Sequence, residues 1–464
     1  MPTDSPPAPT QVARVRGVRA LGRRIAAVPP WCVLAIAWLM IVLYAFPGQM
    51  TQDSWDHLTE ARKNVFTDAH PPVMDLLFRW LDAVIAGPFL ILVLQTTALV
   101  VGLARILAAT FTRRAAAWLT LGLVLYPPIM TPMAVAWKDS VMAGCLVLGV
   151  AALQRKQRAL ALVALFAATA VRYNAFAATL PLIVLCFEWR PGARAVSRYA
   201  VAFVVWLAIT MSAAGVNRWL TDQPMYYWQS SLTVHDIVGT LSLVPGERSD
   251  AELERLFAGT GLLIHHDIHK ALRAHYRPDN FLPIINEPSP LWGLPNNGFV
   301  PAPASVRAAI TRAWWEVITS EPAAYLHHRL AVMYEVISIG PRKMPAAVIR
   351  RDAYRWPEYA HQMGQGTGWS ALQGLWTRLL RAVVRATPVF EPWIYLAISL
   401  LLLPLARRQR DVLALLCSGL VLESTLVLLA PSADYRYSHW MVITTCLAVI
   451  VLTARRSRGP AIRA

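Results

Sequence analysis

Residues 391–430 read EPWIYLAISLLLLPLARRQRDVLALLCSGLVLESTLVLLA. This stretch consists of two apolar runs, about 391–406 and 412–430, that are joined by a basic link at 407–410. Long apolar runs are typical of membrane-spanning helices, and Lys and Arg gather in the short loops that remain in the cytoplasm. The segment therefore predicts two membrane spans that are joined on the cytoplasmic side.

The same alternation of apolar runs and basic clusters continues over most of the chain. Basic clusters flank residues 159–187 on both sides and Arg172-Tyr173-Asn174 interrupts them, so a pair of short spans is expected there. The charges within 71–86 favour an interfacial helix. About ten spans are expected, at 31–47, 87–108, 115–136, 140–154, the pair within 159–187, 199–216, 391–406, 412–430 and 440–454.

These features predict an all-α polytopic protein of the bacterial cytoplasmic (inner) membrane, with outer juxtamembrane helices and one large outer segment. Both chain ends are expected in the cytoplasm because they are Arg-rich, and all eleven histidines fall in segments expected outside. The expected parts are a cytoplasmic basic tail (1–30), an N-terminal membrane core (31–216) with a first outer loop (48–86), an extracytoplasmic segment (217–390), C-terminal spans (391–454) and a cytoplasmic tail (455–464).

The composition favours a membrane protein over a nucleic-acid-binding one. Hydrophobic residues make up 56% of the chain and charged residues only 15%, whereas soluble domains are about a quarter charged. The net charge of +17 comes largely from basic residues beside apolar runs, which is how cytoplasmic loops look. All five cysteines lie inside apolar runs, so no disulfide framework is expected.

Polar residues that could carry chemistry gather at the outer ends of the expected spans, on four different loops. A carboxylate can act as a general base, and Arg and Lys can hold a phosphate. The combination fits a reaction on a phosphate-bearing lipid whose head group lies at the membrane boundary. The residues are Asp53, Asp56, His57 and Glu60 after the first span, Lys138 and Asp139 after the third, Arg172 and Asn174 within the short pair, and Asp434, Arg436, Tyr437 and His439 before the last.

Each of these residues also has a purely structural interpretation. Asp53 or Asp56 could be a solvated loop acid, and Lys138-Asp139 could cap a helix. Arg436 and Tyr437 could be interfacial anchors. The pattern alone leaves these alternatives open.

Two further features stand apart from this set. His265-His266-Asp267-Ile268-His269 has a spacing that zinc could use, but no second ligand group accompanies it, so a solvated face is expected and no metal site. Glu423 lies near the middle of an expected span, where an acid is either functional or paired inside the bundle.

In their order along the chain, these residues resemble the GT-C superfamily of membrane glycosyltransferases. The acidic loop Gln52-Asp53-Ser54-Trp55-Asp56 and the later His70-Pro71-Pro72 resemble the first outer loop of aminoarabinose transferases and protein O-mannosyltransferases. An uncharacterised bacterial branch is more similar still, and its motifs correspond here to Phe46-Pro47-Gly48, Asp53-Ser54, Lys138-Asp139, Arg172-Tyr173-Asn174 and Asp434-Tyr435-Arg436-Tyr437. The resemblance covers the membrane core and not residues 217–390.

The resemblance implies transfer of a sugar from a polyprenyl-phosphate donor to a glycan, lipid or protein acceptor of the cell envelope. The family's first-loop acid falls on Asp53, as a base or to orient the acceptor. A serine follows Asp53 where the mannosyltransferases have a second acid, which leaves Asp56 as an alternative and a divalent metal as a cofactor that the sequence does not require. The implied substrate-binding residues are Asp56, His70, Lys138, Asp139, Arg172, Asn174, Arg436 and Tyr437, with Lys138, Arg172 and Arg436 stabilising the phosphate charge.

Functions of other classes remain alternatives. A transporter or flippase of lipid-linked sugars favours inverted repeats and charged residues along the span interiors, and the sequence shows neither apart from Glu423. A glycan polymerase or ligase is another alternative, as is a non-catalytic partner that retains the fold.

Overall fold

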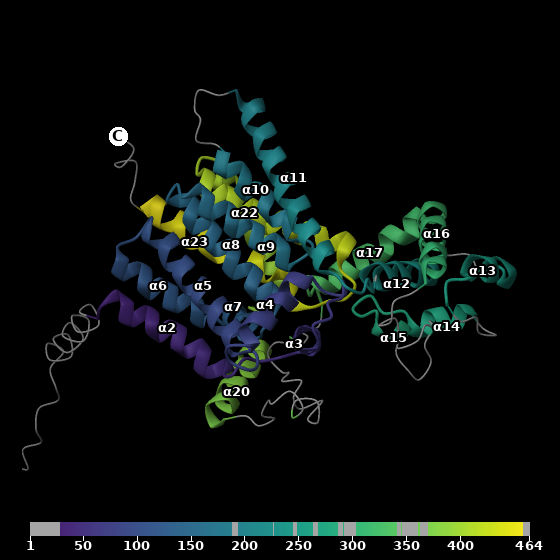
Figure 1. Ribbon diagram of the computed structural model, residues 1–464. Coiled ribbons are helices and arrows are strands. Elements are labelled where there is room, and N and C mark those ends of the chain that lie inside the picture. The colour runs from purple at the N-terminus through teal and green to yellow at the C-terminus, as the bar shows by residue number, and fades with distance from the viewer. Residues whose placement is uncertain are drawn as a thin grey trace, which may run out of the picture.

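The computed structural model describes residues 28–187, 194–225, 227–244, 248–262, 268–285, 291, 303–340, 345, 361 and 370–457. Within these residues the regular structure is helical, and β-pairing is limited to isolated bridges. The helices form a bundle with a smaller lobe beside it (Figure 1). The described part of the chain is therefore all-α, as predicted.

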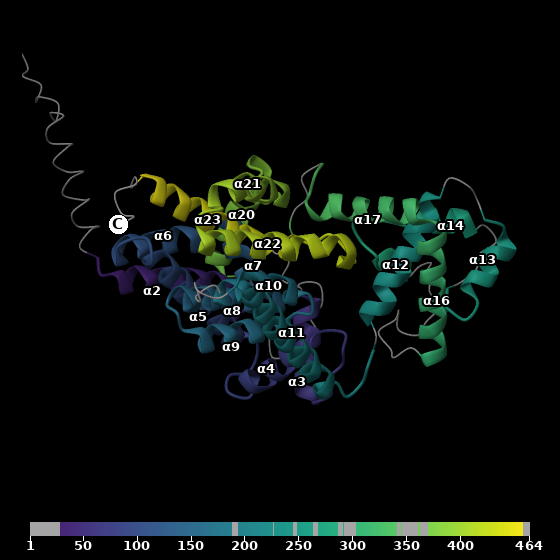
Figure 2. The ribbon, with the colours of Figure 1, turned by 90° about the horizontal axis from the view of Figure 1, so that it is seen from above.

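The bundle is built from apolar helices that lie side by side in Figures 1 and 2. Two short helices, the polar α3 (Gln52–Lys63) and the amphipathic α4 (Pro72–Asp82), lie at one end of it. The bundle helices are α2 (Pro30–Ala45), α5 (Phe89–Ala108), α6 (Arg113–Leu125), α7 (Pro127–Met133), α8 (Lys138–Gln154), α9 (Arg158–Val171), α10 (Ala175–Phe187), α11 (Ala195–Leu220), α21 (Pro392–Ala406), α22 (Arg410–Leu429) and α23 (His439–Ser457), the last preceded by the 3-10 helix η3 (Tyr435–Ser438).

All the expected spans contain helix. The expected count of ten spans is nevertheless wrong, because several of these helices are too short to cross a membrane. In the described part, α5, α11, α22 and the segment Tyr435–Ser457 are long and apolar enough to cross a membrane, and α6 with α7 makes a fifth if this pair, bent by 72°, is one span. The apolar helices α2, α9, α10 and α21 have 13 to 16 residues. At about 1.5 Å per residue they reach about 20–24 Å, less than a hydrocarbon core of about 30 Å.

The break expected inside 159–187 is confirmed. α9 ends at Val171 and α10 begins at Ala175, so Arg172-Tyr173-Asn174 forms the link between two helices. The two helices pack against each other and both contact α8. Arg172 therefore lies at a helix junction instead of within a helix.

Proline ends α6 and bends the chain. Tyr126, directly before Pro127-Pro128, is extended with ψ 118°, because a residue before proline is disfavoured in helical geometry. The segment after α7 is held by Gln95 of α5, whose buried amide donates to the carbonyls of Met133 and Val135, at 2.8 Å each. This contact fixes the stretch that leads into α8.

Glycine allows α5 and α8 to approach closely. A Cβ added to Gly102 would lie 2.4 Å from Cγ1 of Val147 and 3.0 Å from the Val147 carbonyl carbon. Gly122 of α6 has nothing within 4 Å of such a Cβ. The two glycines therefore provide a matched pair, one in a helix interface and one on the surface.

We expect Gly102→Ala to lower the free energy of unfolding by about 1–3 kcal/mol, because the new methyl group overpacks a β-branched neighbour. Gly122→Ala is expected to raise it by up to about 1 kcal/mol through helix propensity alone. Unfolding of the purified variants in the same detergent measures both values. Equal shifts for the two variants would contradict the close α5–α8 packing.

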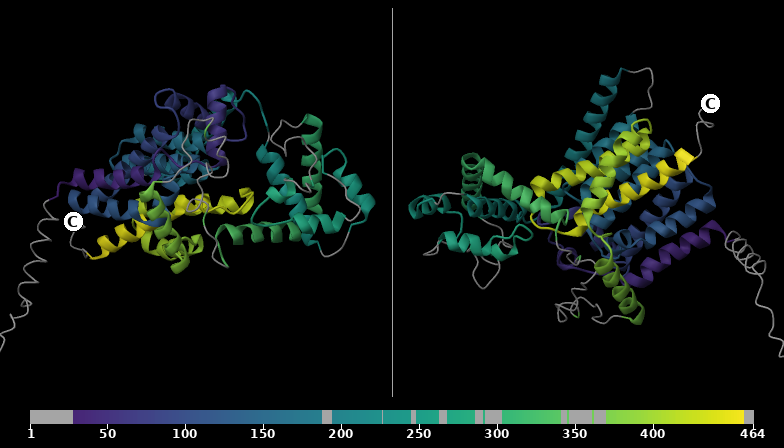
Figure 3. Two further views of the ribbon diagram at one scale, coloured as in Figure 1. Left: turned by 90° about the horizontal axis from the view of Figure 1, so that it is seen from below. Right: turned by 180° about the vertical axis from the view of Figure 1, so that it is seen from behind.

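The lobe has a hydrophobic core of its own. Buried residues such as Val234, Ile237, Leu253, Ile310 and Val317 form a cluster separate from that of the bundle. Figure 3 shows the lobe beside the bundle from two sides. Its helices are α12 (Tyr227–Leu243), α13 (Asp250–Phe257), α14 (Ile268–His275), α15 (Leu282–Ile285), α16 (Ala304–Ser320) and α17 (Pro322–Val336).

The expected outer segment, 217–390, thus forms parts of both the bundle and the lobe. Its first residues complete α11, which ends at Leu220. Most of the rest forms the lobe, where α17 packs on both α12 and α22. Near its end, α20 (Ala371–Ala386) packs on α2, and its Gln373 side chain donates to the carbonyl of Phe46 at 2.8 Å.

α11 is the most exposed of the long helices. Only 11% of its apolar stretch is buried inside the protein. Its final turn is nevertheless anchored, because the buried Asn217 side chain donates to the Ala170 carbonyl at 2.9 Å and accepts from the Val73 amide at 3.1 Å. The end of α11 is therefore fixed against α9 and α4.

Candidate active site

The start of α3 is fastened to the segment before α8. The Trp137 indole donates to the Thr51 hydroxyl at 2.6 Å, and the Ser54 hydroxyl donates to the Ala136 carbonyl at 3.0 Å. The bridge between Gln49 and Val135 adds backbone hydrogen bonds to the same junction. These contacts bring the first turn of α3 against the first turn of α8, although more than 80 residues separate them.

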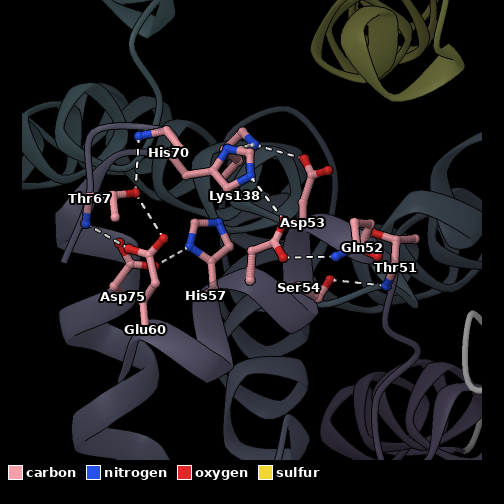
Figure 4. A network of polar contacts seen from close by, with 12 residues as sticks. Thr51, Gln52, Asp53, Ser54, His57, Glu60, Thr67, His70, Asp75 and Lys138 are labelled. Carbon is pink, nitrogen blue, oxygen red and sulfur yellow. Dashed lines mark hydrogen bonds and ion pairs between the residues drawn. The ribbon is translucent and has the colours of Figure 1, made fainter. Parts of the chain in front are cut away.

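Asp53 lies at this junction and binds two cations. Its Oδ2 accepts from Lys138 Nζ at 2.9 Å and from Arg436 Nη1 at 2.9 Å (Figure 4 shows the contact with Lys138). Burial opposes ionisation of Asp53, but Arg436 and Lys138 outweigh it and hold the pKa of this carboxyl well below its usual range. Asp53 is therefore a carboxylate at neutral pH.

Arg436 is oriented from three sides. Its backbone amide and its Nε face the two carboxylate oxygens of Asp434, at 3.1 and 3.2 Å. Its guanidinium lies over the Trp137 ring, 4.8 Å from the centroid, and 5.4 Å from the centroid of Tyr437. Stacking on aromatic rings and pairing with a carboxylate leave few rotamers for this side chain.

Arg172 approaches the same place from the link between α9 and α10. It forms an ion pair with Asp139, which is 1% exposed, and its Nε donates to Asn174 Oδ1 at 2.8 Å. Its guanidinium carbon is 5.3 Å from the centroid of Tyr437. Tyr437 thus lies within contact range of both Arg172 and Arg436.

A cavity of about 680 Å³ lies at these cations, while Asp53 and Asp139 contact the cations without lining it. The three cations expected to meet at the outer ends of their helices, Lys138, Arg172 and Arg436, all line it. The other side of the cavity is apolar. Its wall includes Ala214, Leu232, Leu426, Leu429 and Ala430, and the predicted site residues Asn174 and Tyr437 also line it.

Asp56 and His70 lie beside the cavity without lining it. His70 Nδ1 accepts from Lys138 Nζ at 3.1 Å, and its Nε2 is 3.9 Å from Asp56 Oδ2. Asp56 Oδ1 also accepts from the Gln52 amide at 2.8 Å. Of the two acids left open by the sequence, Asp53 therefore contacts the cations directly, and Asp56 faces His70 one turn later.

His57, a candidate residue, forms a buried pair with Asp75, which was not expected from the sequence. His57 Nδ1 and Asp75 Oδ1 are 2.5 Å apart and both side chains are 1% exposed. Burial lowers the pKa of His57 and raises the pKa of Asp75, so it disfavours the charged form of both side chains. A signal was available, because Asp75 is spaced three residues from both Pro72 and Phe78 on the buried face of α4.

Arg218 and Asp68 also line the cavity and were missed. Arg218 had the same signal as the predicted cations, since it follows an apolar run directly. Asp68 had none, because it lies in a loop rich in polar residues. The cavity therefore carries more charge than the sequence indicated.

The remaining candidates lie elsewhere. Glu423 is 2% exposed and accepts from the Ser438 hydroxyl at 2.7 Å, so it is paired inside the bundle and does not line the cavity. His265 and His266 fall outside the described residues, and His269 contacts the Arg248 carbonyl at 2.9 Å. Among the described residues, no three metal-ligating side chains form a group.

Comparisons with known proteins add no relative. No protein-family model matches the chain, and no curated protein or solved structure is significantly similar to it.

Proposed function

We propose that this chain is a membrane glycosyltransferase with a GT-C-like bundle, which moves a sugar from a polyprenyl-phosphate donor to a cell-envelope acceptor. The observation that carries the proposal is the cavity in which Lys138, Arg172 and Arg436 meet beside an apolar wall. Cations suit a phosphate, and apolar residues suit the first units of a polyprenyl chain. In this proposal the cavity faces the outer side of the bacterial cytoplasmic membrane and both chain ends lie in the cytoplasm.

The contacts of Asp53 suggest how binding and reaction are linked. A donor phosphate that binds Lys138 and Arg436 replaces the Asp53 carboxylate as their partner. The released carboxylate is then free to accept the proton of an acceptor hydroxyl or to orient that hydroxyl. Asp53 thereby has two roles: it pairs with the two cations before the donor binds, and it supplies the acid–base group afterwards.

The charge balance of the transfer fits the same residues. The bond between the anomeric carbon of the sugar and the phosphate oxygen breaks, and a bond forms between that carbon and the acceptor oxygen. The hydroxyl proton passes to Asp53, while negative charge accumulates on the leaving polyprenyl phosphate. Lys138 and Arg436, with Arg172 nearby, stabilise that charge within a largely buried site.

Binding of a short-chain polyprenyl phosphate to the protein in lipid nanodiscs tests the proposal. We expect it to bind at least roughly 100-fold more tightly than the polyprenol of equal length, because charge-assisted hydrogen bonds contribute about 1.5–3 kcal/mol each. A second arm supplies a radiolabelled polyprenyl-phosphate sugar and follows label into envelope acceptors. Appearance of label in an acceptor is the expected result.

The other outcomes separate the alternatives. Equal affinity for the phosphate and the alcohol would remove the anion site, and the proposal with it. Binding without transfer, combined with movement of the labelled lipid between bilayer leaflets, would identify a flippase instead. Comparing the affinity for the sugar-free polyprenyl phosphate with that for the polyprenyl-phosphate sugar shows how much of the binding comes from the sugar.

A further inference from the structure

The lobe contains a buried ionic cluster that the proposed transfer does not use. Asp236 of α12 pairs with Arg329 and with Nε2 of His328, at 3.1 Å for the histidine, and the three side chains are at most 1% exposed. The Trp314 indole donates to the other Asp236 oxygen at 2.8 Å. Buried ion pairs contribute little net stability, because desolvation offsets their attraction. Stability alone therefore does not explain why this ionic cluster lies where it does.

Arg329 extends this cluster to the bundle. While Nη2 faces Asp236, Nη1 donates to the carbonyl of Ala430 at 3.0 Å. Ala430 is the C-cap of α22 and lines the cavity. The final carbonyls of a helix lack partners within the helix, so this bond supplies one of them.

Two more contacts fasten the same loop to the lobe. The Ala433 amide donates to the Asp279 carbonyl at 2.9 Å, close to the bridge between Asn280 and Ser432. Val332 and Val336 of α17 are buried against Tyr437. Residues 430–437, which comprise the loop after α22 and the start of η3, are thus held by the lobe at several points. This segment places Arg436 and Tyr437 at the cavity.

We propose that Arg329, held by Asp236, is a positioning residue that sets the 430–437 loop so that Arg436 and Tyr437 face the phosphate. The inference rests on the proposed anion site. Arginine suits this role because its planar fork donates in two fixed directions, one toward a carboxylate and one toward a carbonyl. Lysine carries its donors on one nitrogen and lacks the planar fork that fixes these two directions.

The test must separate positioning from stability. Arg329→Met alone leaves a buried Asp236 without its cation, so the fold itself could suffer. The double variant Asp236→Asn with Arg329→Met removes both charges together and leaves the Ala430 carbonyl without its donor. Arg455→Gln is the control, because Arg455 forms a bidentate ion pair with Asp411 at the opposite end of α22 and α23.

We expect the double variant to keep a thermal midpoint close to that of the wild type and to bind short-chain polyprenyl phosphate about tenfold more weakly, the loss expected for one misplaced hydrogen bond. The affinity of Arg329→Lys for the polyprenyl phosphate should lie between those of the wild type and the double variant. Amide hydrogen exchange of residues 430–437 should rise in the double variant and stay unchanged in Arg455→Gln.

Two readouts keep this inference apart from the proposed function. Wild-type exchange and phosphate affinity in a stable double variant would overturn the positioning role while the anion site stands. Faster exchange in 430–437 without any phosphate binding by the wild type would instead overturn the anion site, and it would leave Arg329 holding a loop of another purpose.

Discussion

Replacing Arg436 with alanine should reduce transfer from a polyprenyl-phosphate sugar by roughly 100- to 1,000-fold, the range found when one donor to a developing oxyanion is lost. Arg436 binds Asp53, lies over Trp137 and lines the cavity, so no neighbouring side chain can take its position. Affinity for the sugar-free phosphate should fall as well. Initial rates and binding measured in the same nanodiscs give both values.

Two companion variants make this result specific. Arg378→Ala removes an exposed arginine from α20 and should leave transfer unchanged. Arg436→Lys keeps the charge but loses the planar contact with Trp137, so it should restore only part of the activity. Transfer by Arg436→Ala within about twofold of the wild type would exclude Arg436 from the mechanism, since such a loss is far below the cost of one charge-assisted hydrogen bond.

Asp53→Asn is expected to move binding and catalysis in opposite directions. The amide no longer neutralises Lys138 and Arg436, so a sugar-free polyprenyl phosphate should bind several-fold more tightly, by about 1 kcal/mol or more. Transfer should nevertheless fall by roughly 100-fold or more, because the group that accepts the hydroxyl proton is gone. A purely structural role for Asp53 would weaken both.

Asp56→Asn is the matched control for Asp53, one helical turn away. Its carboxylate faces Gln52 and His70 and does not contact Arg436, so the substitution should change phosphate affinity little and transfer less than Asp53→Asn does. If Asp56→Asn showed the larger loss of transfer, the acid–base role would pass to Asp56. Both variants should be compared at equal levels of folded protein.

The ionisation of Asp53 also has a pH consequence. Because its folded pKa is depressed, its ion pairs stabilise the protein fully above the ordinary carboxyl pKa of about 4, and this contribution is lost as the pH falls through the lowered folded value. In the donor-free protein, stability should therefore show no loss attributable to protonation of Asp53 between about pH 5 and 8, which unfolding measured across that range checks.

The positions of the helices could be predicted well from the sequence, and their role as spans less well. Apolar runs and basic clusters located the bundle helices except that 115–136, expected as one span, is divided into α6 and α7, and the break at Arg172-Tyr173-Asn174 followed from the positive-inside rule. The same pattern does not report how many residues of each apolar run form a continuous helix. α9 and α10, at 14 and 13 residues, were therefore counted as spans although they are short for the purpose.

The candidate site was predictable where it depends on the ends of helices. Lys138, Arg172 and Arg436 each follow or precede an apolar run, so a shared level in the membrane brings them near one another. Pairings across the fold could not be predicted. Asp236 and Arg329 lie 93 residues apart in chain order, and neither stands out from the polar residues around it until the lobe is folded.

The exposed helix α11 also fixes the depth at which the cavity lies. Arg198 and Arg218 stand at the two ends of its apolar stretch, 20 residues apart, which is about 30 Å along a helix and matches the hydrocarbon thickness of a bilayer. Arg218 lines the cavity, so in the proposed function the opening would be level with the head groups. A donor lipid would then reach it by diffusion within its own leaflet, and we expect saturation to follow the mole fraction of that lipid in the membrane instead of its amount per volume.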